Sequence, residues 1–225
     1  MERIICLIIG YLFGLFQTAY LYGKAHGSDI RQHGSGNSGT TNTLRVLGTK
    51  AGLIVFAGDC LKCVAAVVIV RLIFGGSHPD MVYLLCLYAG AGTILGHDFP
   101  FYMGFKGGKG IASTAGLIIA LHPYFIVMGV ILFFGTFLTT HLVSLGSLLV
   151  YAGFLIEMVV CGQLGVFGEM PQAYLIEMYV VAGALTAMAY WQHRQNIARL
   201  IQGNERKTYL FKKNKVDVEE KAGEK

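Results

Sequence analysis

Two polar, glycine-rich stretches carry most of the side chains in this sequence that could do chemistry. The first runs from residue 96 to residue 110 and contains His97, Lys106, Gly107, Gly108, Lys109 and Gly110. Glycine allows positive φ and brings backbone N–H groups close to a ligand, so a Gly-Gly pair between two lysines is suited to wrapping an anion. The expected ligand is a phosphate. The alternative is a flexible, positively charged turn between two membrane helices.

The second stretch combines hydroxyl and amide side chains with glycines and an arginine. Its candidate residues are Ser35, Gly36, Asn37, Gly39, Thr40, Thr41, Asn42 and Arg45. A third polar segment follows the last apolar run and offers His193, Asn196 and Glu205. His193 and Asn196 are three residues apart, so on a helix they present polar groups in one direction. Arg194 and Arg199 beside them could equally reach anionic lipid headgroups.

These polar stretches lie between runs of apolar residues. The chain has 225 residues, is 54% hydrophobic and 14% charged, and has a mean hydropathy of +0.56. Such a balance is typical of an integral membrane protein and excludes an ordinary soluble domain. We predict an all-α fold of about seven transmembrane helices, because about 20 apolar residues span a bilayer. The candidate spans are residues 4–22, 51–74, 82–96, 111–121, 123–138, 142–161 and 174–192.

The basic residues predict the orientation. Segments 24–50, 97–110 and 193–225 contain fifteen of the eighteen Lys and Arg residues, and the connections 75–81 and 162–173 contain none. By the positive-inside rule, the first group of segments is cytoplasmic, the N-terminus is outside and the C-terminus is inside. We divide the chain into a membrane domain, residues 1–206, and a charged tail, residues 207–225, predicted to be disordered.

Within the predicted spans, small residues and one charged pair stand out. Gly10 and Gly14 form a G-x-x-x-G pattern, as do Gly92 and Gly96, which allows close helix packing. Asp59 and Lys62 are three apart and can pair on one helix face, which favours a structural role over a functional one. The five cysteines are interpreted as small buried hydrophobic residues.

Several catalytic motifs are missing from the sequence. The G-x-x-x-x-G-K-[ST] pattern of nucleotide P-loops fails at Met103 and at Gly110, and there is no G-x-S-x-G elbow. None of the seven histidines has an aspartate five positions later, as the H-x-x-x-x-D acyltransferases require. What remains is a set of anion-binding residues, which suits substrates that already carry phosphate. A transporter for a phosphorylated metabolite and a catalytically inactive scaffold stay open as alternatives.

The three polar segments resemble the cytoplasmic motifs of the bacterial acyl-phosphate:glycerol-3-phosphate acyltransferases, the PlsY family. The resemblance covers nearly the whole chain, and Gly-Phe-Lys-Gly-Gly-Lys-Gly, at 104–110, is its most specific part. It implies a seven-helix enzyme of the bacterial inner membrane with its active site at the cytoplasmic face. The implied reaction moves a fatty acyl group from acyl phosphate to the sn-1 hydroxyl of glycerol 3-phosphate. The products are lysophosphatidic acid and phosphate, in the first acylation step of phospholipid synthesis.

The resemblance also implies roles for single residues. Ser35, Arg45, Lys106 and His193 become the catalytic candidates. The candidate substrate-binding residues are Gly36, Asn37, Gly39, Thr40, Thr41, Asn42, His97, Gly107, Gly108, Lys109, Gly110, Asn196 and Glu205. The backbone of the two glycines between the lysines would cradle a phosphate, and Glu205 would brace the third segment. Either the donor phosphate or His97 is the general base, with a structural role favoured for His97. Membrane lipids are the expected surroundings, and no cofactor, metal or nucleic acid is expected.

Overall fold

The computed structural model describes residues 1–210, and all of the regular secondary structure within them is helical. The prediction of an all-α membrane protein is confirmed. The helices are α1 (Glu2–Gly14), α2 (Thr18–Ala25), α3 (Thr40–Leu47), α4 (Thr49–Phe74), α5 (Val82–Asp98), α6 (Ile111–Leu121), α7 (Pro123–Thr140), α8 (Val143–Gln163), α9 (Gln172–Gln192) and α10 (Arg194–Ile201). Two short 3-10 turns cover Ile30–Gln32 and Phe101–Met103.

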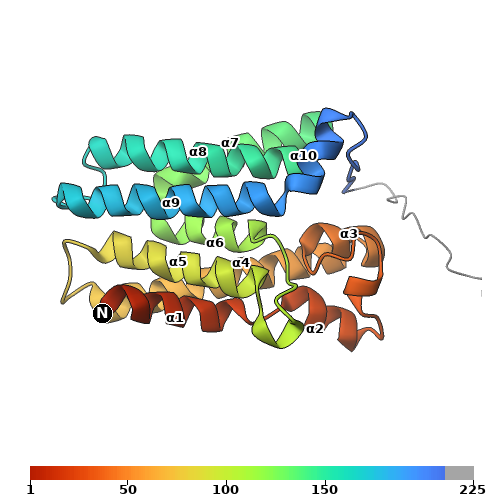
Figure 1. Ribbon diagram of the computed structural model, residues 1–225, viewed down its shortest axis with the longest axis horizontal. Helices are drawn as coiled ribbons and strands as arrows, with labels where there is room; N and C mark the ends of the chain where they lie inside the picture. Colours follow the sequence, from red (N-terminus) through yellow and green to blue (C-terminus); the bar gives the residue numbers. More distant parts are fainter. Residues whose placement is uncertain (211–225) are drawn as a thin grey trace, which may run out of the picture.

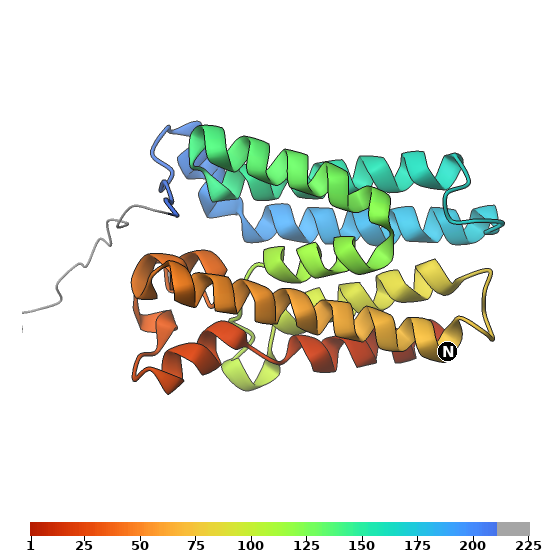
Figure 2. The same ribbon diagram turned by 180° about the vertical axis from the view of Figure 1, so that it is seen from behind.

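The long helices lie side by side along the longest axis of the molecule (Figure 1). Helices α1, α4 and α5 form one half, α7, α8 and α9 form the other, and α6 lies between the halves in both views (Figures 1 and 2). The N-terminus lies at one end of the bundle, and α10 lies at the opposite end (Figure 1). The short helices α2, α3 and α10, which contain or adjoin the polar segments, therefore meet at one end of the molecule.

Within residues 1–210, six apolar segments are long enough to cross a membrane by length and composition. They are Glu2–Ala25, Thr49–Phe74, Val82–Met103, Pro123–Thr140, Val143–Gln163 and Gln172–Gln192. The one predicted span that is missing from these six is residues 111–121, which form α6. This helix has 11 residues and is therefore about 16 Å long, roughly half of a hydrocarbon core. Most of its side chains are buried, so α6 packs inside the protein, where a short helix does not leave backbone groups exposed to lipid.

Helices α1 and α5 pack closely through their glycines. A Cβ atom on Gly10 would lie 2.0 Å from the Ala89 carbonyl oxygen, and one on Gly92 would lie 2.1 Å from the Leu7 carbonyl oxygen. No side chain fits at these distances, so the backbones touch only because both positions are glycine. The packing role predicted for these glycine patterns is confirmed.

The break between α1 and α2 is fixed by a buried glutamine. Gln17 is fully buried, and its Nε2 donates to the carbonyl oxygens of Gly14, Gly96 and His97 at 3.2, 3.3 and 3.0 Å. These carbonyls lie at the C-terminal ends of α1 and α5, where helices leave acceptors without intrahelical partners. Gln17 thus ties the junction between α1 and α2 to the end of α5.

The predicted boundary between the membrane domain and the tail differs from the structure. Thr208 is only 1% exposed and its amide donates to the His141 carbonyl at 2.9 Å. Residues 208–210 therefore belong to the folded body, and the expectation of a solvated tail is wrong for these three residues, whereas Lys207 is exposed as expected. Hydroxyl and carbonyl groups make these contacts, which hydropathy and charge patterns do not reveal. Residues 211–225, the rest of the predicted tail, lie outside the described residues.

Candidate active site

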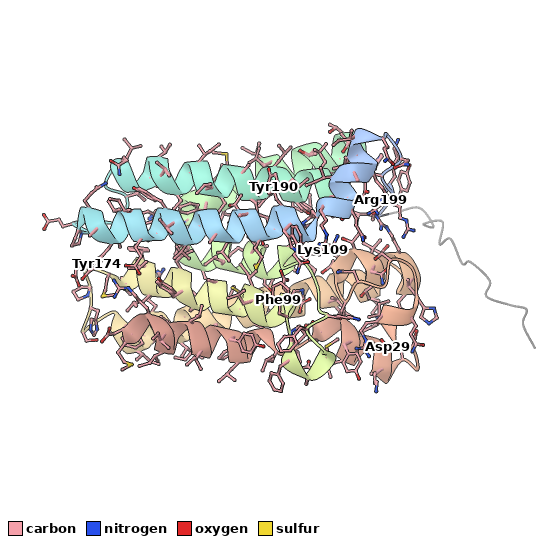
Figure 3. The ribbon with its side chains drawn as sticks, in the orientation of Figure 1. Asp29, Phe99, Lys109, Tyr174, Tyr190 and Arg199 are labelled. Atoms are coloured by element: carbon pink, nitrogen blue, oxygen red, sulfur yellow. The ribbon has the colours of Figure 1, made fainter. Side chains whose placement is uncertain are left out.

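A cavity of about 790 Å³ lies at the end of the bundle where the polar segments meet. Polar residues from all three predicted segments line it: Ser35, Gly36, Asn37, Gly39, Thr40, Thr41, Asn42, Arg45, His97, Lys106, Gly107, Lys109, His193, Asn196 and Glu205. Lys109 and Arg199 lie close together at this end, and Tyr174 marks the opposite end (Figure 3). The structure therefore brings together segments that are about 150 residues apart in the chain.

The N-terminus of α3 supplies unpaired backbone donors to this cavity. Gly39 is the N-cap residue, in an extended conformation, and no side chain caps the helix. Within residues 1–210, the amides of Thr40 and Thr41 have no hydrogen-bond acceptor, and both residues line the cavity. A helix N-terminus carries a partial positive charge, so these amides suit a phosphate.

Asn42 lines the cavity and also holds the loop before α3 in its conformation. Its Nδ2 donates to the Ile30 and His33 carbonyls at 3.1 and 3.0 Å, and its Oδ1 accepts from the Ser35 amide at 2.8 Å. The side chain is 2% exposed, so its polar atoms are occupied by backbone groups. From the sequence we expect this amide to contact a substrate. In the structure its hydrogen-bonding groups bind the protein backbone instead, and Asn42 holds the Ser35 amide in place.

The glycine loop is anchored differently from the predicted cradle. The Gly107 amide donates to the Asp98 carbonyl at 3.0 Å, and the Gly108 amide donates to the His97 carbonyl at 3.1 Å. The expectation that these two amides wrap a phosphate is therefore wrong, because the C-terminal carbonyls of α5 already accept from them. The reason is that α5 ends beside the loop and needs donors for its last carbonyls.

The N-terminus of α6 takes the place of that cradle. Gly110 is its N-cap residue, with φ +73°, and no side chain caps the helix. Ile111 and Ala112, in the first turn, line the cavity, and their amides have no acceptor within residues 1–210. Two helix N-termini, those of α3 and α6, thus face one cavity, and Lys106 and Lys109 flank the second.

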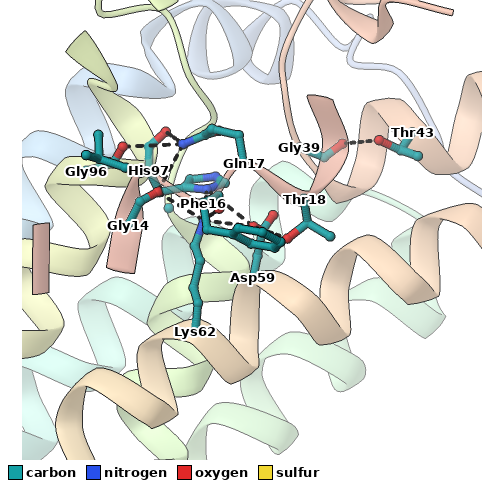
Figure 4. Close-up of polar contacts among 12 residues, drawn as sticks. Gly14, Phe16, Gln17, Thr18, Gly39, Thr43, Asp59, Lys62, Gly96 and His97 are labelled. Carbon is teal, nitrogen blue, oxygen red and sulfur yellow. Dashed lines mark hydrogen bonds and ion pairs between the residues drawn. The ribbon is translucent and has the colours of Figure 1, made fainter. Parts of the chain in front are cut away.

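His97 belongs to a buried network (Figure 4). The Lys62 ammonium lies 2.9 Å from its Nδ1 and donates to Asp59 Oδ1 at 2.8 Å. An ammonium group has only donors, so Nδ1 accepts and the imidazole proton sits on Nε2. That Nε2 packs against Gly108, where a Cβ would lie only 2.0 Å away. Nδ1 thus already accepts from Lys62 and Nε2 carries the proton, so neither nitrogen is free to take a proton from a substrate. This favours the structural role of His97 over general-base catalysis. The predicted Asp59–Lys62 pair is confirmed.

The third segment is held together by Glu205. Its Oε1 accepts from Asn196 Nδ2 at 2.7 Å and from the Ser144 hydroxyl at 3.1 Å, and its Oε2 accepts from Arg199 Nε at 2.7 Å. Asn196 Oδ1 in turn accepts a short hydrogen bond from the Lys109 ammonium. The expected bracing role of Glu205 is confirmed. Through Asn196 it also orients a lysine of the glycine loop.

Burial changes the proton affinity of two residues in this cluster. It lowers the pKa of His193 to about 4, and the nearby Lys109 charge adds to the shift. Burial also lowers the pKa of Lys109 from 10.5 to about 8, with Arg199 as the next cause. His193 Nδ1 lies 2.8 Å from the Ala189 carbonyl and must donate to it, so neutral His193 presents an unprotonated Nε2. It is therefore a hydrogen-bond acceptor at neutral pH.

A family model described as glycerol-3-phosphate acyltransferase matches residues 4–203 of this chain. The chain belongs to the glycerol-3-phosphate acyltransferase family. A relative from Exiguobacterium sibiricum with that name is 37% identical over 219 residues, covering 97% of this chain and 99% of the relative. Another from Halalkalibacterium halodurans is 41% identical, covering 89% and 93%.

A solved structure supports the same family. The crystal structure of PlsY (YgiH), described as an integral membrane glycerol 3-phosphate acyltransferase in its glycerol 3-phosphate form, matches with a TM-score of 0.79 and 30% identity. The match covers 94% of this chain and all of that chain. The resemblance to the PlsY family found in the sequence is confirmed.

In this member of the acyltransferase family, some cavity residues lie outside the predicted motifs. Ser144, Ser147 and Gln192 line the cavity, and Ser144 also binds Glu205. They begin α8 or end α9, inside runs that the sequence shows only as apolar spans. The sequence feature that could have identified them is a polar residue near the first or last turn of an apolar run. Phe56 and Phe133 line an apolar part of the same cavity.

Proposed function

We propose that this protein transfers a fatty acyl group from acyl phosphate to the sn-1 hydroxyl of glycerol 3-phosphate, forming lysophosphatidic acid and phosphate. This would be the first acylation step of phospholipid synthesis. The observation that carries the proposal is the pairing of two anion-suited helix N-termini, those of α3 and α6, on one cavity. Two phosphate groups, one on the donor and one on the acceptor, require two such positions.

The residues of the cavity divide between these two positions. At the first, the Thr40 and Thr41 amides, the Ser35 hydroxyl and the Arg45 guanidinium would hold one phosphate. At the second, Lys106, Lys109 and the first turn of α6 would hold the other and offset its charge as it departs. Charge-assisted hydrogen bonds of this kind are each worth about 1.5–3 kcal/mol, so several together supply substantial binding and orientation.

The chemistry needs no cofactor in this proposal. The sn-1 hydroxyl oxygen attacks the acyl carbonyl carbon, the ester bond forms, and the bond between that carbon and the phosphate oxygen breaks. The hydroxyl proton passes to the donor phosphate. His193 Nε2 would accept a hydrogen bond from the acceptor substrate and orient it. With a pKa of about 4, His193 is a weak base, which favours the phosphate as the final proton acceptor.

The surroundings of the cavity suit a lipid donor. Phe56 from α4 and Phe133 from α7 form part of its wall, and both helices are long enough to cross a membrane. An acyl chain could lie against these rings while its phosphate reaches the polar part. By the positive-inside rule, we place this end of the protein at the cytoplasmic face of the bacterial inner membrane.

The test is a product assay on detergent-purified protein with glycerol 3-phosphate and, in parallel, acyl phosphate or acyl-CoA. We expect lysophosphatidic acid, detected by mass spectrometry, with acyl phosphate and without added metal. Lys106→Ala should lower turnover by orders of magnitude, because Lys106 is an exposed cation of the cavity. Product from acyl-CoA alone would overturn the donor assignment. Flux of glycerol 3-phosphate into liposomes without product would identify a transporter instead.

A further inference from the structure

The chain continues past α10 as a short segment that returns across the open end of the bundle. We call residues 204–210 the C-terminal strap. It lies beyond residue 203, where the family match ends. Glu205, at its start, binds α8 and α10 as described above, and Arg206 lines the cavity. Thr208 and Leu210, further along the strap, also reach the opposite side of the site.

The strap joins the two halves of the molecule. The Thr208 amide donates to the His141 carbonyl, just after α7, at 2.9 Å, and the Tyr209 ring lies 4.7 Å from the His141 ring. On the other half, the Thr49 hydroxyl at the start of α4 donates to the Leu210 carbonyl at 2.8 Å. The strap therefore has an anchor on each side of the cavity, and Thr208 lies between them.

Thr208 also contacts a residue of the candidate site. Its hydroxyl oxygen accepts from Arg45 Nε at 3.0 Å and from Arg45 Nη2 at 2.7 Å. Nη2 donates in addition to the Arg206 carbonyl at 3.0 Å. Two bonds from one edge of a planar guanidinium fix the plane of the group. Because Thr208 is 1% exposed, water does not compete for this hydroxyl.

The partners of Arg45 orient it without neutralising it. They are a hydroxyl and a carbonyl, and within residues 1–210 no carboxylate forms an ion pair with Arg45. The Nη1 amino group has no hydrogen-bond partner in the same part of the chain. Arg45 lines the cavity, so a charged guanidinium with one free amino group remains for an anion.

We propose that Thr208 is a positioning residue: its hydroxyl orients Arg45 so that the free amino group of the guanidinium can bind a substrate phosphate. The proposal rests on the proposed function, because it assumes a phosphate-bearing substrate in this cavity. A long arginine side chain loses rotamer freedom when it binds a ligand. Thr208 imposes that order before the substrate arrives, which raises affinity without a direct contact.

Three variants separate this role from simple anchoring of the strap. Thr208→Val keeps the shape of the side chain and removes both bonds to Arg45, whereas Thr208→Ser keeps the hydroxyl. Thr49→Val is the matched control, because it removes a threonine hydroxyl that holds the same strap but does not touch Arg45. The kcat and KM for glycerol 3-phosphate and for acyl phosphate are measured for each variant, together with the melting temperature.

We expect Thr208→Val to raise the KM of one phosphate-bearing substrate about tenfold with a much smaller change in kcat. Thr208→Ser and Thr49→Val should stay within about twofold of the wild type. Wild-type kinetics for Thr208→Val would overturn the proposal, as would an equal loss in Thr49→Val or in Thr208→Ser. If Thr208→Val misfolds, Thr208→Ala, which also removes both bonds to Arg45, is judged by the same criteria. An inactive wild-type protein would instead refute the proposed function.

Discussion

The lowered pKa of Lys109 predicts an alkaline limit to activity that an ordinary lysine would not cause. Below pH 8 its ammonium is charged and can hold a substrate phosphate; above pH 8 it loses its proton, and anion binding weakens as the pH rises. Because the pKa of Lys109 is about 8, the Lys109 amine is protonated in roughly 9% of the free enzyme molecules at pH 9, against roughly 91% at pH 7. We therefore expect kcat/KM to fall about tenfold between these pH values.

The assay measures kcat/KM for glycerol 3-phosphate between pH 6.5 and pH 9.5, with correction for spontaneous hydrolysis of acyl phosphate. The second pKa of a phosphate monoester is about 6, so the substrate is mainly a dianion over most of this range. The profile of kcat/KM reports the free enzyme. In kcat itself the limit should appear at higher pH, because a bound phosphate favours the charged form of Lys109.

Lys109→Arg tests the assignment directly. A guanidinium keeps its charge throughout this range, so the alkaline limit should move beyond pH 9.5, even if the maximal rate is lower. Lys50→Arg is the control: Lys50 is exposed and is not a cavity residue, so the limit should stay near pH 8. An unchanged limit in Lys109→Arg, or none below pH 9.5 in the wild type, would refute the reasoning.

Three further predictions concern the supports of the site. Gly108→Ala places a methyl group 2.0 Å from His97 Nε2, so we expect turnover to fall at least about a hundredfold and the melting temperature to drop, as overpacking costs about 1–3 kcal/mol. Glu205→Gln should raise KM about tenfold, whereas Glu169→Gln, exposed and outside the cavity, should change nothing; equal effects would contradict the bracing role. Asn42→Ala removes three hydrogen bonds and should lower the free energy of unfolding by about 2–4 kcal/mol, measured by denaturant titration.

Much of the candidate site could be predicted from residue types, because glycine, lysine and hydroxyl-rich segments are rare among apolar spans. The association of Ser35, Lys106 and Asn196 with one cavity follows from three polar segments lying at one end of the bundle. The sequence could not show which donors are free. Gly107 has the right type to cradle a phosphate, yet its amide binds the Asp98 carbonyl, a contact fixed by where α5 ends.

The sequence alone determined that this is a helical membrane protein with three polar segments and the motifs of an acyltransferase family. Hydropathy and local motifs are properties of neighbouring residues, so they can be read without a fold. Only the tertiary structure decided that α6 is buried inside the protein, that the His97 ring lies between Lys62 and Gly108, and that Thr208 orients Arg45. These contacts join residues up to 163 positions apart. Their geometry depends on how the whole chain packs, which no local pattern records.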